Sequence, residues 1–116
     1  MESDQKSLHA QALLETAKAL WYLGEYQKAF LAQRKALQQA IESKDARLGI
    51  SARCLGGLIA MNLGDLSAAE QELKEALEAA RTTGLRGEEA AQLNNLGIVA
   101  RQRGDLDRAQ GFFQQA

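Results

Sequence analysis

The side chains that most often carry out chemistry in proteins are scarce in this chain of 116 residues. It has one histidine, His9, and one cysteine, Cys54. A disulfide within the chain, a thiolate zinc cage and most histidine-based acid–base schemes are therefore excluded. Gly56-Gly57 lacks the spacing of a nucleotide-binding loop and has no strand before it, so helix packing explains this pair better. We expect no catalytic site, no cofactor and no metal, and predict that the protein is not an enzyme.

The charge balance argues against polyanionic partners. Lysine and arginine number 14, aspartate and glutamate number 15, and the net charge is −1. Nucleic-acid binding requires a surplus of cations, so a helical-repeat RNA reader is disfavoured and no nucleic-acid partner is expected. No apolar run approaches the roughly 20 residues that span a bilayer, and the opening MESDQKS is not typical of a signal peptide. These observations predict a soluble, cytoplasmic protein with no membrane partner.

The elements that position any binding side chains are predicted to be helices. The chain contains 21 Ala, 18 Leu and 12 Gln, no Pro, and only 5 Val and Ile together. Alanine, leucine and glutamine favour helices, whereas strands are enriched in β-branched residues. The composition therefore predicts an all-α protein.

A period of 40 residues organises the chain. Gly24, Gly64 and Gly104 are each followed by an acidic residue, and each lies 40 residues after the previous one. Further columns repeat in the same register: Ala29, Ala69 and Ala109; Ala36, Ala76 and Ala116; Ala17, Gly57 and Gly97. A period maintained through three copies is the signature of a repeat architecture.

Each period reads as two helices joined by a short turn. The glycine at the turn is suited to the left-handed conformation that ends a helix, and Asp65 and Asp105 are suited to cap the next one. The short connection requires an antiparallel hairpin. The predicted helices are near 6–23, 25–43, 46–63, 65–81, 86–103 and 105–116.

Gly56, Gly57 and Gly97 fall within predicted helices, where each costs about 1 kcal/mol relative to alanine. Such glycines indicate that two helices approach closely. We expect the partner helix to contribute the alanine column at 29, 69 and 109.

These columns resemble the tetratricopeptide repeat family, most clearly in Asn95-Leu96-Gly97, Gly104-Asp105-Leu106 and Ala109. The resemblance implies a right-handed α-α superhelix, or solenoid, of three antiparallel helix pairs. The repeats would span about 10–44, 50–84 and 90–116, the last incomplete. The period of 40 residues, rather than the family's usual 34, is similar to that of a longer-helix subclass. Because Leu13, Arg53 and Leu93 replace the usual early aromatic residue, a particular ligand cannot be transferred.

In this family the first helix of each pair lines a concave groove that binds peptides. Projecting one face of each such helix gives a candidate binding set with apolar, amide and cationic side chains: Gln11, Leu14, Lys18, Trp21, Tyr22, Ser51, Cys54, Leu58, Met61, Asn62, Asn94, Asn95, Ile98, Arg101 and Gln102. Trp21 has two interpretations, an anchor for the ligand or a packing residue against the next helix pair. The family's carboxylate clamp is not matched, because Leu55 stands where an asparagine is needed, so binding to chaperone tails is not expected.

The resemblance implies a protein-interaction module that binds a peptide or partner domain, as part of a larger adaptor or regulatory protein. The last repeat stops within its second helix, so we expect Phe112 and Phe113 to lie at an uncovered end. One explanation for the uncovered end is that the chain is a fragment of a longer repeat array. The alternative is a scaffold in which this end binds another copy and forms a homo-oligomer.

Overall fold

The computed structural model describes residues 2–116, and in that range the secondary structure is entirely helical. The prediction of an all-α protein is confirmed. Helix α1 begins four residues earlier than expected, and its first turn carries Glu2 and Asp4, which favour the positive end of the helix dipole. The helices span α1 Glu2–Tyr22, α2 Tyr26–Ser43, α3 Ala46–Asn62, α4 Leu66–Thr83, α5 Arg86–Gln102 and α6 Leu106–Gln115.

The turn within each helix pair is built as the glycine column predicts. Gly24, Gly64 and Gly104 have φ of 79°, 81° and 83°, the left-handed conformation in which glycine is favoured. Asp65 Oδ1 accepts from the backbone N–H of Ala68 at 3.0 Å, so the predicted cap is present. Asp105 makes the equivalent bond to residue 108 at 3.1 Å. Local chemistry therefore fixes all three hairpins.

The turns between pairs use the same backbone geometry. Gly84 has φ of 72°, but the equivalent position after α2 is Lys44 with φ of 60°. The N–H of the next residue, Asp45 or Leu85, bonds back to Ala40 or Ala80 in each case. Consecutive helices are therefore antiparallel throughout the chain.

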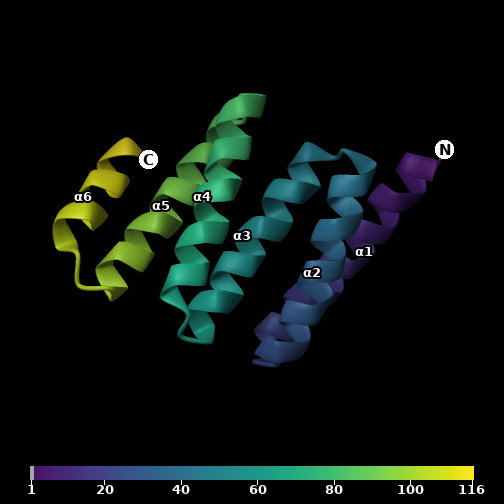
Figure 1. Ribbon diagram of the computed structural model, residues 1–116, viewed down its shortest axis with the longest axis horizontal. Coiled ribbons are helices and arrows are strands. Elements are labelled where there is room, and N and C mark those ends of the chain that lie inside the picture. Colours follow the sequence, from purple (N-terminus) through teal and green to yellow (C-terminus); the bar gives the residue numbers. More distant parts are fainter. Residues whose placement is uncertain (1) are drawn as a thin grey trace.

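The three helix pairs stack side by side in a slab of 47 × 33 × 18 Å, with α1 at one end and α6 at the other (Figure 1). The backbones of α1 and α3 approach each other, as do those of α3 and α5, whereas those of α2, α4 and α6 do not. The first helices of the pairs therefore lie on the inner side of the row. This arrangement is an all-α solenoid, as predicted.

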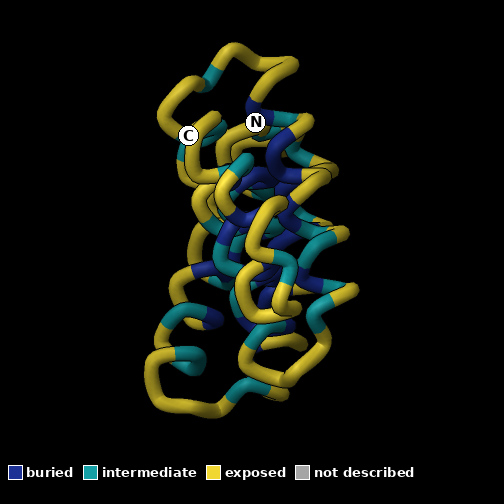
Figure 2. Tube along the Cα trace, turned by 90° about the vertical axis from the view of Figure 1, so that its left-hand side faces the viewer, coloured by how far each residue is buried: buried dark blue, intermediate teal, exposed yellow. Residues whose placement is uncertain are grey.

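The core runs through the middle of the slab, and the turns are exposed (Figure 2). Its buried side chains are mainly alanine and leucine. A Cβ on Gly57 would lie 2.7 Å from Leu73 Cγ and 3.4 Å from the Ala69 carbonyl oxygen. A Cβ on Gly97 would meet the Phe113 ring. The glycines thus permit close packing, but the side chain four residues after the expected alanine fills most of the space.

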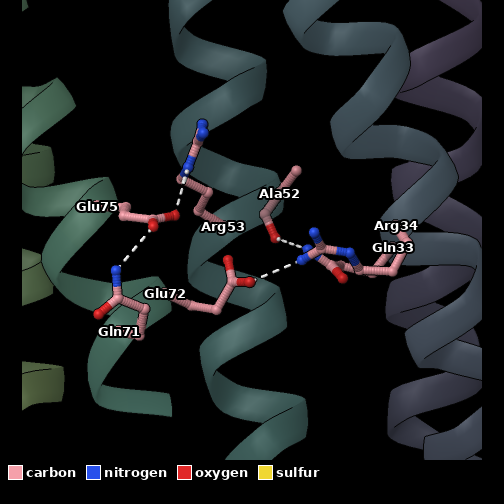
Figure 3. A network of polar contacts seen from close by, with 7 residues as sticks. All are labelled: Gln33, Arg34, Ala52, Arg53, Gln71, Glu72 and Glu75. Carbon is pink, nitrogen blue, oxygen red and sulfur yellow. Dashed lines mark hydrogen bonds and ion pairs between the residues drawn. The ribbon is translucent and has the colours of Figure 1, made fainter. Parts of the chain in front are cut away.

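Gln33 stands at the repeat position of Leu73 and Phe113 but reaches across to α3. It is fully buried, and its Nε2 donates to the Ala52 carbonyl oxygen at 2.8 Å (Figure 3). A Cβ on Gly56 would lie 2.6 Å from the same nitrogen, which explains the second glycine of the pair. Nearby, Arg34 pairs with Glu72 at 2.7 Å and joins α2 to α4.

Candidate functional site

The inner side of the solenoid carries a hollow that crosses three helices. Its volume is about 230 Å³, and most of its accessible lining is apolar. We call it the inner hollow. Helix α1 contributes Lys18, Trp21 and Tyr22; α3 contributes Ser51, Cys54, Leu55 and Leu58; α5 contributes Glu88, Ala91 and Gln92. Six residues of the predicted binding set therefore surround one cavity: Lys18, Trp21, Tyr22, Ser51, Cys54 and Leu58.

Trp21 is held by the next repeat. Its indole Nε1 donates to Asn62 Oδ1 at 2.6 Å, and its ring packs against the core formed by α1, α2 and α3. The ring of Tyr22 lies 5.2 Å away, centroid to centroid, and Tyr22 is 81% exposed. Trp21 therefore packs against the next helix pair, and the ring that it presents to the hollow is fixed in place.

Cys54 lines the hollow from α3 and is half-buried. Burial raises the pKa of its thiol, with a further contribution from the Glu88 carboxylate, so the neutral thiol is the form present near pH 7. Asn95 Nδ2 donates to Cys54 Sγ at 3.5 Å. Cys54 therefore acts as a small apolar part of the wall and not as an activated nucleophile.

One predicted binding residue is wrong. Leu14 is only 3% exposed, because it lies on the same stripe of α1 as Ala10 and Ala17, which faces the core. The face of α1 predicted from the sequence is therefore wrongly oriented about the helix axis at Leu14, where it includes a residue that faces the core. Leu14 is therefore excluded from the binding surface.

The other predicted residues lie on the inner helices outside the hollow. Gln11, Asn94 and Gln102 are exposed, whereas Met61 and Ile98 are half-buried. Met61 also packs against the core between α3 and α6. These residues can contact a long ligand but not one confined to the hollow.

The terminal phenylalanines are better covered than predicted. Phe112 is half-buried and packs against the core of the last two pairs, with the Arg108 guanidinium 5.6 Å above its ring. Phe113 fills the space beside Gly97, with Arg101 at 5.9 Å, and remains 37% exposed. The expectation of an uncovered aromatic end is wrong for Phe112, because the last helix pair packs its own aromatic residues.

Four residues that line the hollow are outside the predicted set: Leu55, Glu88, Ala91 and Gln92. Leu55 and Gln92 are almost fully buried, and Glu88 lies in the first turn of a helix, where an acidic residue also favours the helix dipole without binding anything. The signal for Gln92 was its column: Ala12 and Ala52 occupy the equivalent positions, so a long polar side chain there is a departure from the repeat.

A larger hollow of about 490 Å³ lies beside the turn between α2 and α3. Its central polar groups already bond one another, since Ser7 Oγ donates to Asp45 Oδ2 at 2.8 Å and Asp45 also caps α3. None of the buried side-chain atoms without a hydrogen-bond partner in the described part of the chain belongs to a residue of this larger hollow.

Helix pairs stacked in a row, with their first helices inside, define a helical-repeat protein. A sequence model of the tetratricopeptide repeat matches residues 47–116, more than half of the chain, so the chain belongs to that family. The fold is similar to the TPR domain of Arabidopsis FLU, with a TM-score of 0.83 over 97% of this chain and 92% of that one. The two sequences are 21% identical, a level at which the likeness supports the fold alone. No curated protein matches the chain.

Tetratricopeptide repeats are generally protein-interaction modules, and the fold is typically non-enzymatic. Within residues 2–116, every helix is too short or too polar to cross a membrane.

Proposed function

We propose that this protein binds a peptide or a partner domain on the inner side of its solenoid and serves as part of a larger adaptor or regulatory protein. The inner hollow is the observation that carries this proposal. Three repeats each contribute side chains to it, and a rigid aromatic residue, Trp21, stands at one end. Such a combination of fixed aromatic surface and polar rim is typical of peptide-binding sites.

The test starts from a displayed library of random 12-residue peptides selected on the immobilised protein. The affinity of selected peptides is then measured for the double variant Tyr22→Ala, Arg101→Ala. Both side chains are exposed, so helicity by circular dichroism should not change, whereas affinity should fall about tenfold.

The matched control is Leu31→Ala, Lys35→Ala, which removes an exposed apolar and an exposed cationic side chain from α2. Affinity should be unchanged in this control. Equal losses in the two variants, or no loss in either, would place the binding surface elsewhere.

A scaffold assembled through the last helix pair is the second candidate. Leu106 is 66% exposed and Phe113 is 37% exposed on this end of the solenoid. If they form a self-association surface, the mass measured by light scattering should rise with protein concentration, and Leu106→Glu should abolish the rise. Leu106 suits this test because its side chain is largely free of packing, whereas Phe113 also fills space beside Gly97. A constant monomer mass would exclude the scaffold.

A further inference from the structure

The inner hollow contains a buried hydrogen-bond acceptor that lacks a donor. Gln92 is 1% exposed, lines the hollow, and its Oε1 is bonded to no group in the described part of the chain. Leaving such an acceptor unsatisfied is unfavourable, because the buried oxygen has lost its hydrogen bonds to water. A group that enters the hollow with an N–H or O–H donor would satisfy it.

A carboxylate stands one helical turn before this acceptor. Glu88 and Gln92 are four residues apart on α5, and both line the hollow. Glu88 is half-buried and makes no ion pair within residues 2–116, whereas the adjacent Glu89 pairs with Arg81 at 3.1 Å. Glu88 lies in the first turn of α5, at the positive end of the helix dipole. The α5 wall therefore presents a negative charge and a neutral acceptor together.

The rest of the hollow is suited to an aliphatic chain. Leu55, Leu58 and Ala91 are apolar, and the Cys54 thiol is neutral. The indole N–H of Trp21 is already used by Asn62. Lys18, the one cation at the hollow, lies on α1 and pairs with Glu15 of its own helix at 3.5 Å. Because α3 separates α1 from α5, this cation and the α5 wall mark opposite sides of the cavity.

We propose that the inner hollow binds an arginine side chain of a partner peptide. Its methylene groups would pack on Leu55 and Leu58, and its guanidinium would donate to the Glu88 carboxylate and to Gln92 Oε1. Arginine fits better than lysine because its planar guanidinium offers five donors and can reach two acceptors at once. An acidic side chain would be repelled by Glu88. This inference rests on the proposed function and specifies the ligand of the same surface.

The test uses peptides selected on the wild-type protein from the random 12-residue library. The proposal expects an arginine at one shared position among them. That arginine is then replaced by citrulline, which retains N–H donors without the charge, and by norleucine, which retains only the aliphatic chain. Affinity should fall about fivefold for citrulline and further for norleucine.

The protein variant Glu88→Gln tests whether the Glu88 carboxylate is the group that binds the guanidinium. It should weaken the arginine peptide about fivefold and leave the citrulline peptide unchanged. Glu78→Gln is the matched control, because Glu78 is an exposed carboxylate on α4 that does not line the inner hollow. This change should affect neither peptide.

The outcomes separate the inference from the function. If the selected peptides lose affinity for the variant Tyr22→Ala, Arg101→Ala but share no arginine, the arginine site is wrong and the proposed function stands. The same conclusion follows if Glu88→Gln has no effect on their affinity. A library that yields no binder, or binders insensitive to the double variant, overturns both proposals. If Glu78→Gln weakens the arginine peptide as much as Glu88→Gln does, the assignment of the arginine-binding carboxylate to α5 is wrong.

Discussion

Two buried glutamines occupy equivalent depths in the core but have different surroundings. Gln33 lies between α2 and α3, where its Nε2 donates to the Ala52 carbonyl oxygen and its Oε1 has no hydrogen-bond partner. Gln92 Oε1 on α5 also lacks a partner, but Gln92 borders the inner hollow, which a ligand can enter, whereas Gln33 does not line that hollow. A buried polar group without a partner costs stability, and proteins often tolerate that cost at functional sites. We therefore regard Gln33 as structural and Gln92 as a binding residue.

The two positions should respond differently to leucine. Gln92→Leu should raise the free energy of unfolding by about 1 kcal/mol, because it removes an unsatisfied acceptor and keeps a similar volume. Gln33→Leu should leave the free energy of unfolding nearly unchanged, because it removes a buried hydrogen bond together with an unsatisfied acceptor. Urea unfolding followed by circular dichroism measures both. A loss of stability in Gln92→Leu would show that its oxygen is satisfied in solution, for example by water.

At the scale of elements, the turns determine where each helix stops. Four of the five turns place glycine in the left-handed region, and the turn after α2 places Lys44 there instead. A side chain in this conformation is disfavoured by roughly 1 kcal/mol. Lys44 is exposed, so no packing compensates for the strain.

Lys44→Gly should therefore raise the free energy of unfolding by about 1 kcal/mol. The matched control is the reverse change at the equivalent turn, Gly84→Lys, which should lower the stability by a similar amount. Thermal or urea unfolding measures the difference. No gain in Lys44→Gly would mean that the lysine makes a compensating interaction at this turn.

Helices α4 and α6 are tied by a cluster of charges around Glu70. Its Oε1 lies 2.8 Å from Arg108 Nη2 and 3.0 Å from Lys74 Nζ, and its Oε2 lies 3.5 Å from Arg103. Hydrogen bonds from Arg108 and Lys74 lower the pKa of this carboxyl to about 2 from an ordinary 4.5. The charged form is therefore stabilised by the folded state.

A carboxyl whose pKa is lower in the folded state contributes stability above its unfolded pKa, and loses it as the pH falls. For Glu70 the loss should fall between about pH 4.5 and 2. Between pH 6 and 3, the wild type should lose roughly 1 kcal/mol more stability than Glu70→Gln, allowing for solvent screening. Urea unfolding at several pH values measures this, with Glu78→Gln as control. Parallel curves for wild type and Glu70→Gln would contradict the tether.

The sequence predicted the elements well because their ends depend on local chemistry. Gly64-Asp65 specifies both the end of α3 and the cap of α4 without reference to the rest of the molecule. The rotation of each helix depends instead on the neighbours it packs against, which is why Leu14 was placed in the groove although it is buried. Gln92 and Glu88 were missed for the same reason, since their roles appear only when α3 and α5 come together.

At the scale of the whole molecule, the backbone contacts between helices within residues 2–116 join consecutive helices or the first helices of adjacent pairs. Each helix packs against the next, the first helices of adjacent pairs approach each other, and no backbone contact joins the first pair to the third within residues 2–116. In such an array, stability is close to a sum of repeat and interface contributions. A destabilising substitution in one terminal helix pair should therefore lower the stability of that pair and not of the pair at the opposite end.

Phe113→Ala tests this expectation. It removes the ring that fills the space beside Gly97, so it should destabilise the last pair by about 2 kcal/mol, less than a fully buried phenylalanine because Phe113 is 37% exposed. Hydrogen exchange should lose protection in α5 and α6 and keep it in α1 and α2. Leu106→Ala, an exposed change on the same helix, should alter neither region. Equal loss of protection in all six helices would instead show that the solenoid unfolds as a single cooperative unit, in which case the inner hollow would open and close as a whole.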